Sequence, residues 1–165
     1  MEHIERVITL VMLLLIQVLI LNNIHLFQVA TPLLYVLFVI TFRRGMPKWM
    51  ILTYSFLLGL LLDIFTNTPG LAAGTMTLIA VIQPYLLETL TPRDSAENMR
   101  VSVSTMGFSK FVTFSAILVG IYCVVFFALE AFNFFDWQLW LLRSVCSAAL
   151  TMVLMLAIES VRSRR

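Results

Sequence analysis

Charged residues are scarce in this chain of 165 residues. They make up 12% of the sequence, about half of the roughly 25% found in soluble domains. Hydrophobic residues make up 61%, and the mean hydropathy is +0.98. So few charges cannot cover a domain of this size unless lipid replaces water around most of its surface. A soluble globular protein is therefore excluded, and an all-α integral membrane protein is predicted.

Reactive groups are scarce as well. The two cysteines, Cys123 and Cys146, stand in apolar runs without the spacing of a metal or redox motif. We expect buried structural thiols, with a disulfide between neighbouring helices as the open alternative. The sequence has no GxSxG, HExxH or phosphate-loop motif. We therefore expect no enzyme, no metal and no cofactor.

Six apolar segments follow one another along the chain. Their predicted bounds are 7–22, 27–42, 49–65, 71–88, 108–132 and 138–159. A spanning helix needs about 20 residues, so six spans leave no room for a soluble domain. The first segment is also a candidate signal peptide, but no small-residue cleavage site follows it, and retention is favoured. The sequence predicts one transmembrane domain over residues 1–165 with six helices.

Basic residues fall almost entirely on one side of this six-span arrangement. Ten of the 11 lysines and arginines lie on the side of both termini, and Arg143 lies near the other side. Cytoplasmic loops of membrane proteins carry an excess of such residues, so both termini are predicted to be cytoplasmic. The ten residues are Arg6, Arg43, Arg44, Lys48, Arg93, Arg100, Lys110, Arg162, Arg164 and Arg165.

Two charged residues near the predicted outer helix ends need an explanation, because charge within lipid is costly. Asp63 ends the third segment and Arg143 begins the sixth, at similar depth. We expect an ion pair between them, with Glu130 or Asp136 as competing partners for the arginine. Contact with water at the outer interface is the alternative.

Other polar residues within or near the spans have structural interpretations. Gln83 and Pro84 predict a kink in the fourth helix, because proline removes a backbone donor and the amide can bind a freed carbonyl or a neighbouring helix. A substrate-binding break is the less favoured interpretation. Gln17 is expected to bond between helices. Glu88 and Glu159 are expected to reach the cytoplasmic interface.

Small residues form a stripe on the third helix. Ser55, Gly59 and Asp63 stand four residues apart, so they share one helix face, and Gly70 and Gly74 repeat the spacing. Small residues let two helix backbones approach closely in a membrane. The pattern predicts a tight hairpin between the third and fourth helices, and a dimer face is the less favoured alternative.

The segment Phe56–Ala73 resembles the MreD family of rod shape-determining proteins. That family has a helix ending in G-x-x-x-D-[IL], a short polar turn, and a glycine that opens the next helix; Gly59, Asp63 and Gly70 match it. Chain length and Pro32 before a short second span agree too. The residue-level resemblance covers about 20 positions, and the layout covers the whole chain.

The resemblance implies a non-enzymatic scaffold in the bacterial inner membrane that takes part in rod-shape control and lateral peptidoglycan synthesis. Its implied partners are MreC and, through it, MreB and the glycosyltransferase and transpeptidase pair; membrane lipid is expected, and nucleic acid is not. The family is similar in architecture to the S components of energy-coupling-factor vitamin transporters. A substrate-binding S component is therefore the alternative function, with Asn67, Asn133 and Gln138 as its few polar candidates.

Overall fold

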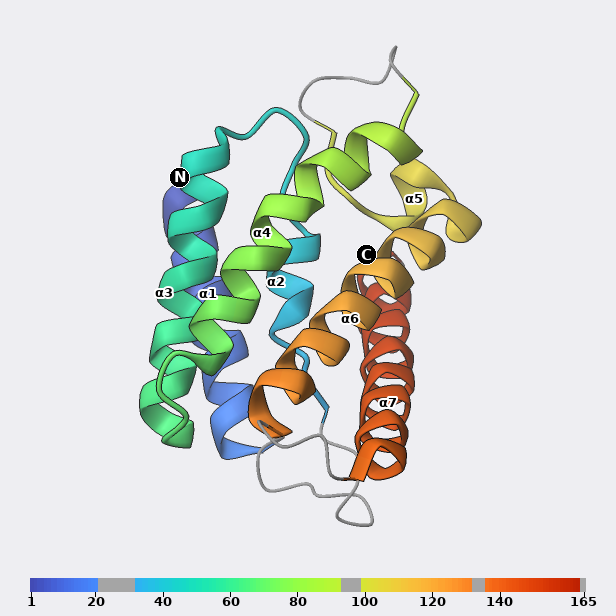
Figure 1. Cartoon of the computed structure of the whole chain (residues 1–165). Coiled ribbons are helices and arrows are strands. Elements are labelled where there is room, and N and C mark those ends of the chain that lie inside the picture. Colours follow the sequence, from blue (N-terminus) through green and yellow to red (C-terminus); the bar gives the residue numbers. More distant parts are fainter. Residues whose placement is uncertain (21–31, 93–98, 132–135, 164–165) are drawn as a thin grey trace.

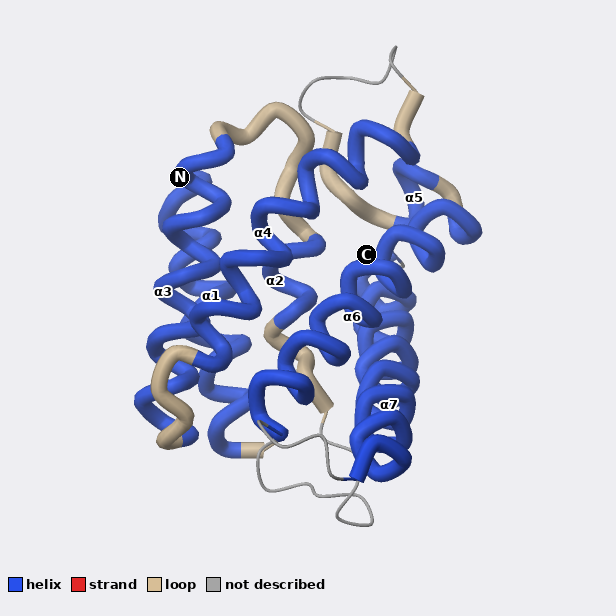
Figure 2. Tube along the Cα trace, viewed as in Figure 1, coloured by secondary structure: helices blue, strands red, loops and turns tan. Residues whose placement is uncertain are grey.

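The chain folds into helices joined by short connections. A computed structural model describes residues 1–20, 32–92, 99–131 and 136–163. These ranges contain seven α-helices and no strand, which confirms the all-α prediction (Figures 1 and 2). The helices are α1 (Glu2–Leu19), α2 (Val36–Ile40), α3 (Lys48–Thr66), α4 (Leu71–Leu90), α5 (Val103–Met106), α6 (Phe108–Ala131) and α7 (Trp137–Ser163).

Four of these helices, α3, α4, α6 and α7, are long and apolar enough to cross a membrane. At a rise of 1.5 Å per residue, the 19 residues of α3 span about 28 Å and the 24 residues of α6 about 36 Å, close to or beyond the ~30 Å hydrocarbon core. The chain is thus a multi-pass membrane protein. Helix α1 is not among the four, and its 18 residues include Glu2, Glu5 and Arg6.

In the second predicted span, 27–42, the observed helix is much shorter than predicted. Its first five residues lie outside the described ranges, and in 32–42 the α-helix covers only the five residues of α2. Pro32 lacks a backbone donor, and turn-like hydrogen bonds such as Val36 N–H to the Leu33 carbonyl (3.3 Å) lead into the helix. The segment is buried, which is where a membrane protein tolerates irregular backbone.

The helices alternate in direction. Figure 1 shows α1, α3 and α6 running one way and α2, α4 and α7 the other, with the N-terminus, α5 and the end of α7 towards one end of the molecule. The turn between α3 and α4 lies at the opposite end. Short helix α2 contacts α1, α3, α4 and α6, so the core forms around it. The largest fully buried side chains of the core include Phe42, Phe111, Phe114, Leu118 and Tyr122.

Candidate functional site

The turn between α3 and α4 is built on left-handed backbone. Asn67, which directly follows α3, has φ = 57°, and Gly70 before α4 has φ = 83°. Asparagine and glycine are the residues that adopt this conformation at least cost. Helix α4 therefore starts only a few residues after α3 ends, and the two helices pack as a hairpin.

Gly59 lies at a close approach of α3 to α4. A Cβ atom at this position would stand 2.6 Å from Ala73 Cα, 2.7 Å from the Ala72 carbonyl oxygen and 2.8 Å from Ala73 N. All three atoms are backbone, so no side chain can move aside. The close approach of the two helices requires glycine here.

The Asp63 carboxylate binds the first turn of α4. Its Oδ1 accepts hydrogen bonds from Ala72 N–H (2.8 Å) and the Thr68 hydroxyl (3.0 Å), and its Oδ2 accepts one from Ala73 N–H (2.9 Å). The first N–H groups of a helix have no partner within it and carry partial positive charge. Asp63, which is 4% exposed, thus caps α4 from the neighbouring helix.

The remaining residues of the small-residue stripe differ in environment. Ser55 is fully buried, and its hydroxyl has no partner within the described residues. Gly74 is exposed, and a Cβ atom added there would meet no atom within 4 Å. Gly74 therefore is not part of the close approach, although its spacing suggested that it was.

The structure does not bring Asp63 and Arg143 together. Asp63 is committed to α4, whereas Arg143 lines a cavity of about 390 Å³ that also contacts Glu130 and Asp136. Among the described residues no ion pair joins Arg143 to either acid, and its Nε atom is buried without a hydrogen-bond partner. The carboxylate of Asp63 therefore binds N–H groups of α4, and not the Arg143 guanidinium that the sequence predicted as its partner.

Gln17 of α1 bonds the irregular backbone before α2. Its amide N–H donates to the Pro32 carbonyl (2.9 Å), and its carbonyl oxygen accepts from Leu34 N–H (3.2 Å). Thr151 of α7 accepts from Leu33 N–H (3.1 Å). The sequence identified Gln17 as a bond between helices but gave no signal for Thr151, because hydroxyls also bond within their own helix.

Gln83 of α4 bonds the other end of the segment 32–42 that contains α2. Its buried amide N–H donates to the Phe42 carbonyl at 3.4 Å, while its Oε1 has no partner among the described residues. Helix α4 continues through Pro84 to Leu90. The amide thus bonds a neighbouring segment, one of the two roles expected for it.

Glu159 is buried, contrary to the expectation that it reaches the interface. It is 1% exposed, and its Oε1 accepts hydrogen bonds from the Ser102 hydroxyl (2.5 Å) and Val103 N–H (3.2 Å). These bonds hold the start of α5 against α7. Glu88, by contrast, is exposed as expected.

The aromatic and sulfur groups of α6 belong to the core. The hydroxyls of Tyr122 and Tyr35 form a hydrogen bond, and Phe126 stacks on Tyr122 with ring centroids 5.6 Å apart. Cys123 of α6 is buried, Cys146 of α7 is partly buried, and both are free thiols. The open alternative of a disulfide between them is therefore not formed.

The comparisons with known proteins give no relative. No protein-family model, curated protein or solved structure matches this chain.

Proposed function

We propose that this chain is a non-enzymatic membrane scaffold of the MreD type, a subunit of the bacterial cell-elongation complex. The observation that carries the proposal is the use of the motif residues. Gly59 and Asp63 act on the backbone of α4, through close packing and through hydrogen bonds to Ala72 and Ala73. Two of the residues that carry the resemblance thus join α3 and α4 into one closely packed helix pair, as a scaffold requires.

The proposed topology has six spans with both termini in the cytoplasm. It is supported by the helix directions in Figure 1, where α1 and the segment through α2 run alongside the four long helices and continue their alternation. The 18 residues of α1 reach about 27 Å. Basic residues gather at the end of the molecule that holds the N-terminus. They favour an orientation in the bacterial inner membrane in which this end faces the cytoplasm.

The proposed partner is MreC, through which the chain connects with MreB and with the glycosyltransferase and transpeptidase pair that builds lateral peptidoglycan. Apolar side chains on the outer faces of α1 and α7 are exposed and offer contact area to lipid and to a partner's single span. Examples are Val11, Leu15, Val145 and Val153. Holding the partner's span would fix its extracytoplasmic domain relative to the synthases.

The experiment is recovery of MreC from membrane extracts with the tagged chain, together with cell shape. We expect Gly59→Leu to lower recovery and to produce rounded cells, because the side chain forces α3 and α4 apart. Gly74→Leu is the matched control, since it places the same side chain in open space. Equal recovery and rod shape in both variants would contradict the proposal.

A substrate-binding S component is the second candidate, favoured by the cavity of about 390 Å³ beside Arg143. Besides its charged residues it is lined by Phe127 and Trp140, and the Trp140 indole N–H is buried without a partner among the described residues. Charged and aromatic groups of this kind can hold a small ligand. A vitamin retained by the purified protein would favour this candidate over the scaffold.

A further inference from the structure

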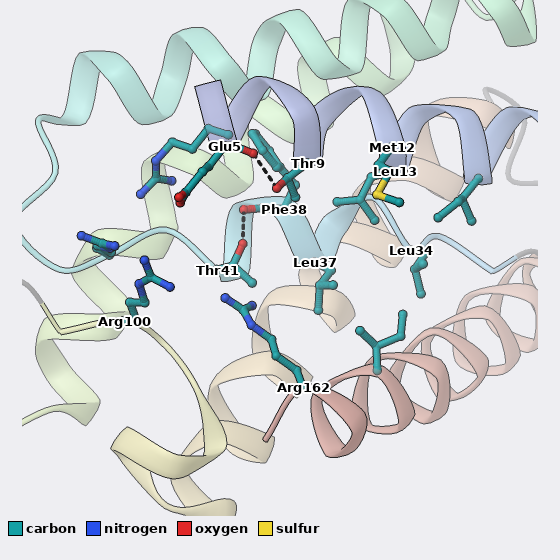
Figure 3. A pocket seen from close by; sticks show the side chains of 14 residues that line it. Glu5, Thr9, Met12, Leu13, Leu34, Leu37, Phe38, Thr41, Arg100 and Arg162 are labelled. Atoms are coloured by element: carbon teal, nitrogen blue, oxygen red, sulfur yellow. Dashed lines mark hydrogen bonds between the residues drawn. The ribbon is translucent and has the colours of Figure 1, made fainter. Parts of the chain in front are cut away.

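A second cavity, of about 560 Å³, lies at the end of the molecule that holds the N-terminus. It forms a groove between α1, the segment through α2, and α7 (Figure 3). Its floor is apolar and includes Leu13, Ile16, Leu34 and Leu37. One end of this groove is basic, and the other reaches towards the middle of the bundle.

The basic end gathers arginines from four separate parts of the chain. Figure 3 shows Arg100 and Arg162 on the side of the groove near Thr41, with Leu34 and Met12 farther along. Four arginines against one glutamate, Glu5, give the lining a formal charge of +3. The arginines are Arg6, Arg43, Arg100 and Arg162. A concave surface with this charge attracts an anion.

The length of the groove matches one leaflet of a membrane. Arg6 and Ile16 both line it and are ten residues apart on α1, which is about 15 Å along the helix. Half of the ~30 Å hydrocarbon core is the same distance. A ligand with its charge at the arginines would therefore extend its apolar part to the middle of the bilayer.

We propose that this groove binds an anionic phospholipid, with its phosphate at the arginines and one acyl chain along the apolar floor. Guanidinium groups bind phosphate through paired, charge-assisted hydrogen bonds. A partner helix fits less well, because a helix 10–12 Å wide occupies roughly 400–600 Å³ per turn. The whole groove would thus take about one turn of a spanning helix, whereas a slender chain can follow its length.

The first test titrates the delipidated full chain, in neutral detergent, with phosphatidylglycerol or phosphatidylcholine of identical acyl chains, and follows bound lipid by native mass spectrometry. We expect phosphatidylglycerol to bind at least tenfold more tightly. Arg162→Gln should weaken its binding about fivefold, and the double variant with Arg100→Gln about 25-fold. Lys110→Gln, an exposed charge outside the groove, should change nothing.

Two further variants identify the occupant. Thr9 is exposed and lines the groove, and within the described residues its hydroxyl bonds only its own helix, at the Glu5 carbonyl (2.8 Å). Thr9→Trp should therefore block the acyl chain without disturbing the core. We expect it to weaken phosphatidylglycerol binding tenfold or more. A photo-cross-linking residue at Met12, which is 62% exposed, should yield a phospholipid adduct in membranes.

Several outcomes would overturn the proposal. Equal binding of the two lipids, or equal losses in Arg162→Gln and Lys110→Gln, would mean a general surface effect. Competition by millimolar inorganic phosphate as strong as that by phosphatidylglycerol would mean a site for a free anion. A protein adduct at Met12 would mean that a partner helix or a second copy fills the groove. None of these outcomes depends on binding of MreC.

Discussion

The substitution Gly59→Ala tests the contact between α3 and α4 most directly. The new Cβ atom would stand 2.6 Å from Ala73 Cα, whereas ordinary van der Waals contact begins at 3.4 Å. The helices must therefore separate by about 0.8 Å at this point. The same shift would lengthen the bonds from Asp63 to Ala72 and Ala73 N–H from 2.8 and 2.9 Å to about 3.6 and 3.7 Å, beyond hydrogen-bond range.

The expected loss of stability is about 2–4 kcal/mol. Overpacking a close contact costs about 1–3 kcal/mol of stability. A hydrogen bond to a charged group contributes about 1.5–3 kcal/mol, and the helices can keep part of this contribution by tilting instead of separating evenly. Gly74→Ala is the control, because its Cβ atom meets nothing within 4 Å. Alanine favours helix over glycine by up to about 1 kcal/mol, so this variant should be neutral or more stable. Gly59→Ala should thus lower stability, and Gly74→Ala should not.

The assay is reversible denaturant unfolding in mixed micelles, followed by far-ultraviolet circular dichroism. The two alanine variants and the wild type should share the same slope and differ in midpoint. The reasoning is refuted if Gly59→Ala is as stable as Gly74→Ala. It is also refuted if the Gly59 variant unfolds later than the wild type.

Three other substitutions follow from the hydrogen bonds. The double variant Asp63→Arg with Arg143→Asp should reach no higher protein level than Asp63→Arg alone, because the two side chains have different surroundings. A higher level in the double variant would support the ion pair. Gln17→Leu should cost about 2–4 kcal/mol in the same unfolding assay, since it leaves two backbone groups unpaired; a loss under 1 kcal/mol would count against this. Glu159→Gln should speed hydrogen exchange around Ser102, and unchanged exchange would show that the carboxylate does not hold α5.

Much of the helical architecture follows from the sequence, because lipid imposes a simple rule on composition. Long apolar segments at 49–65, 71–88, 108–132 and 138–159 coincide closely with α3, α4, α6 and α7. Spacing also placed Ser55, Gly59 and Asp63 on one face, and all three are buried. These features depend on local composition and helix periodicity, which the sequence displays directly.

Partners across the bundle were harder to predict. Opposite charges at equal depth suggested an ion pair, but depth does not say which helix faces which, and the N–H groups of α4 were closer to Asp63. Glu159 looked like an interfacial residue because Arg162 follows it. Its burial depends on Ser102, 57 residues away, which no local pattern connects with it.

Three polar side chains in the interior share one role that their chemistry alone does not reveal. Asp63 binds the start of α4, Gln17 the backbone before α2, and Glu159 the start of α5. Each lies where a backbone donor has no partner in a helix, and in lipid such a donor must be satisfied by protein. These side chains hold the helices in place, whereas Arg100 and Arg162 line the groove that we propose binds a lipid phosphate. Loss of stability should therefore follow changes at the first group, and loss of lipid binding should follow changes at the second.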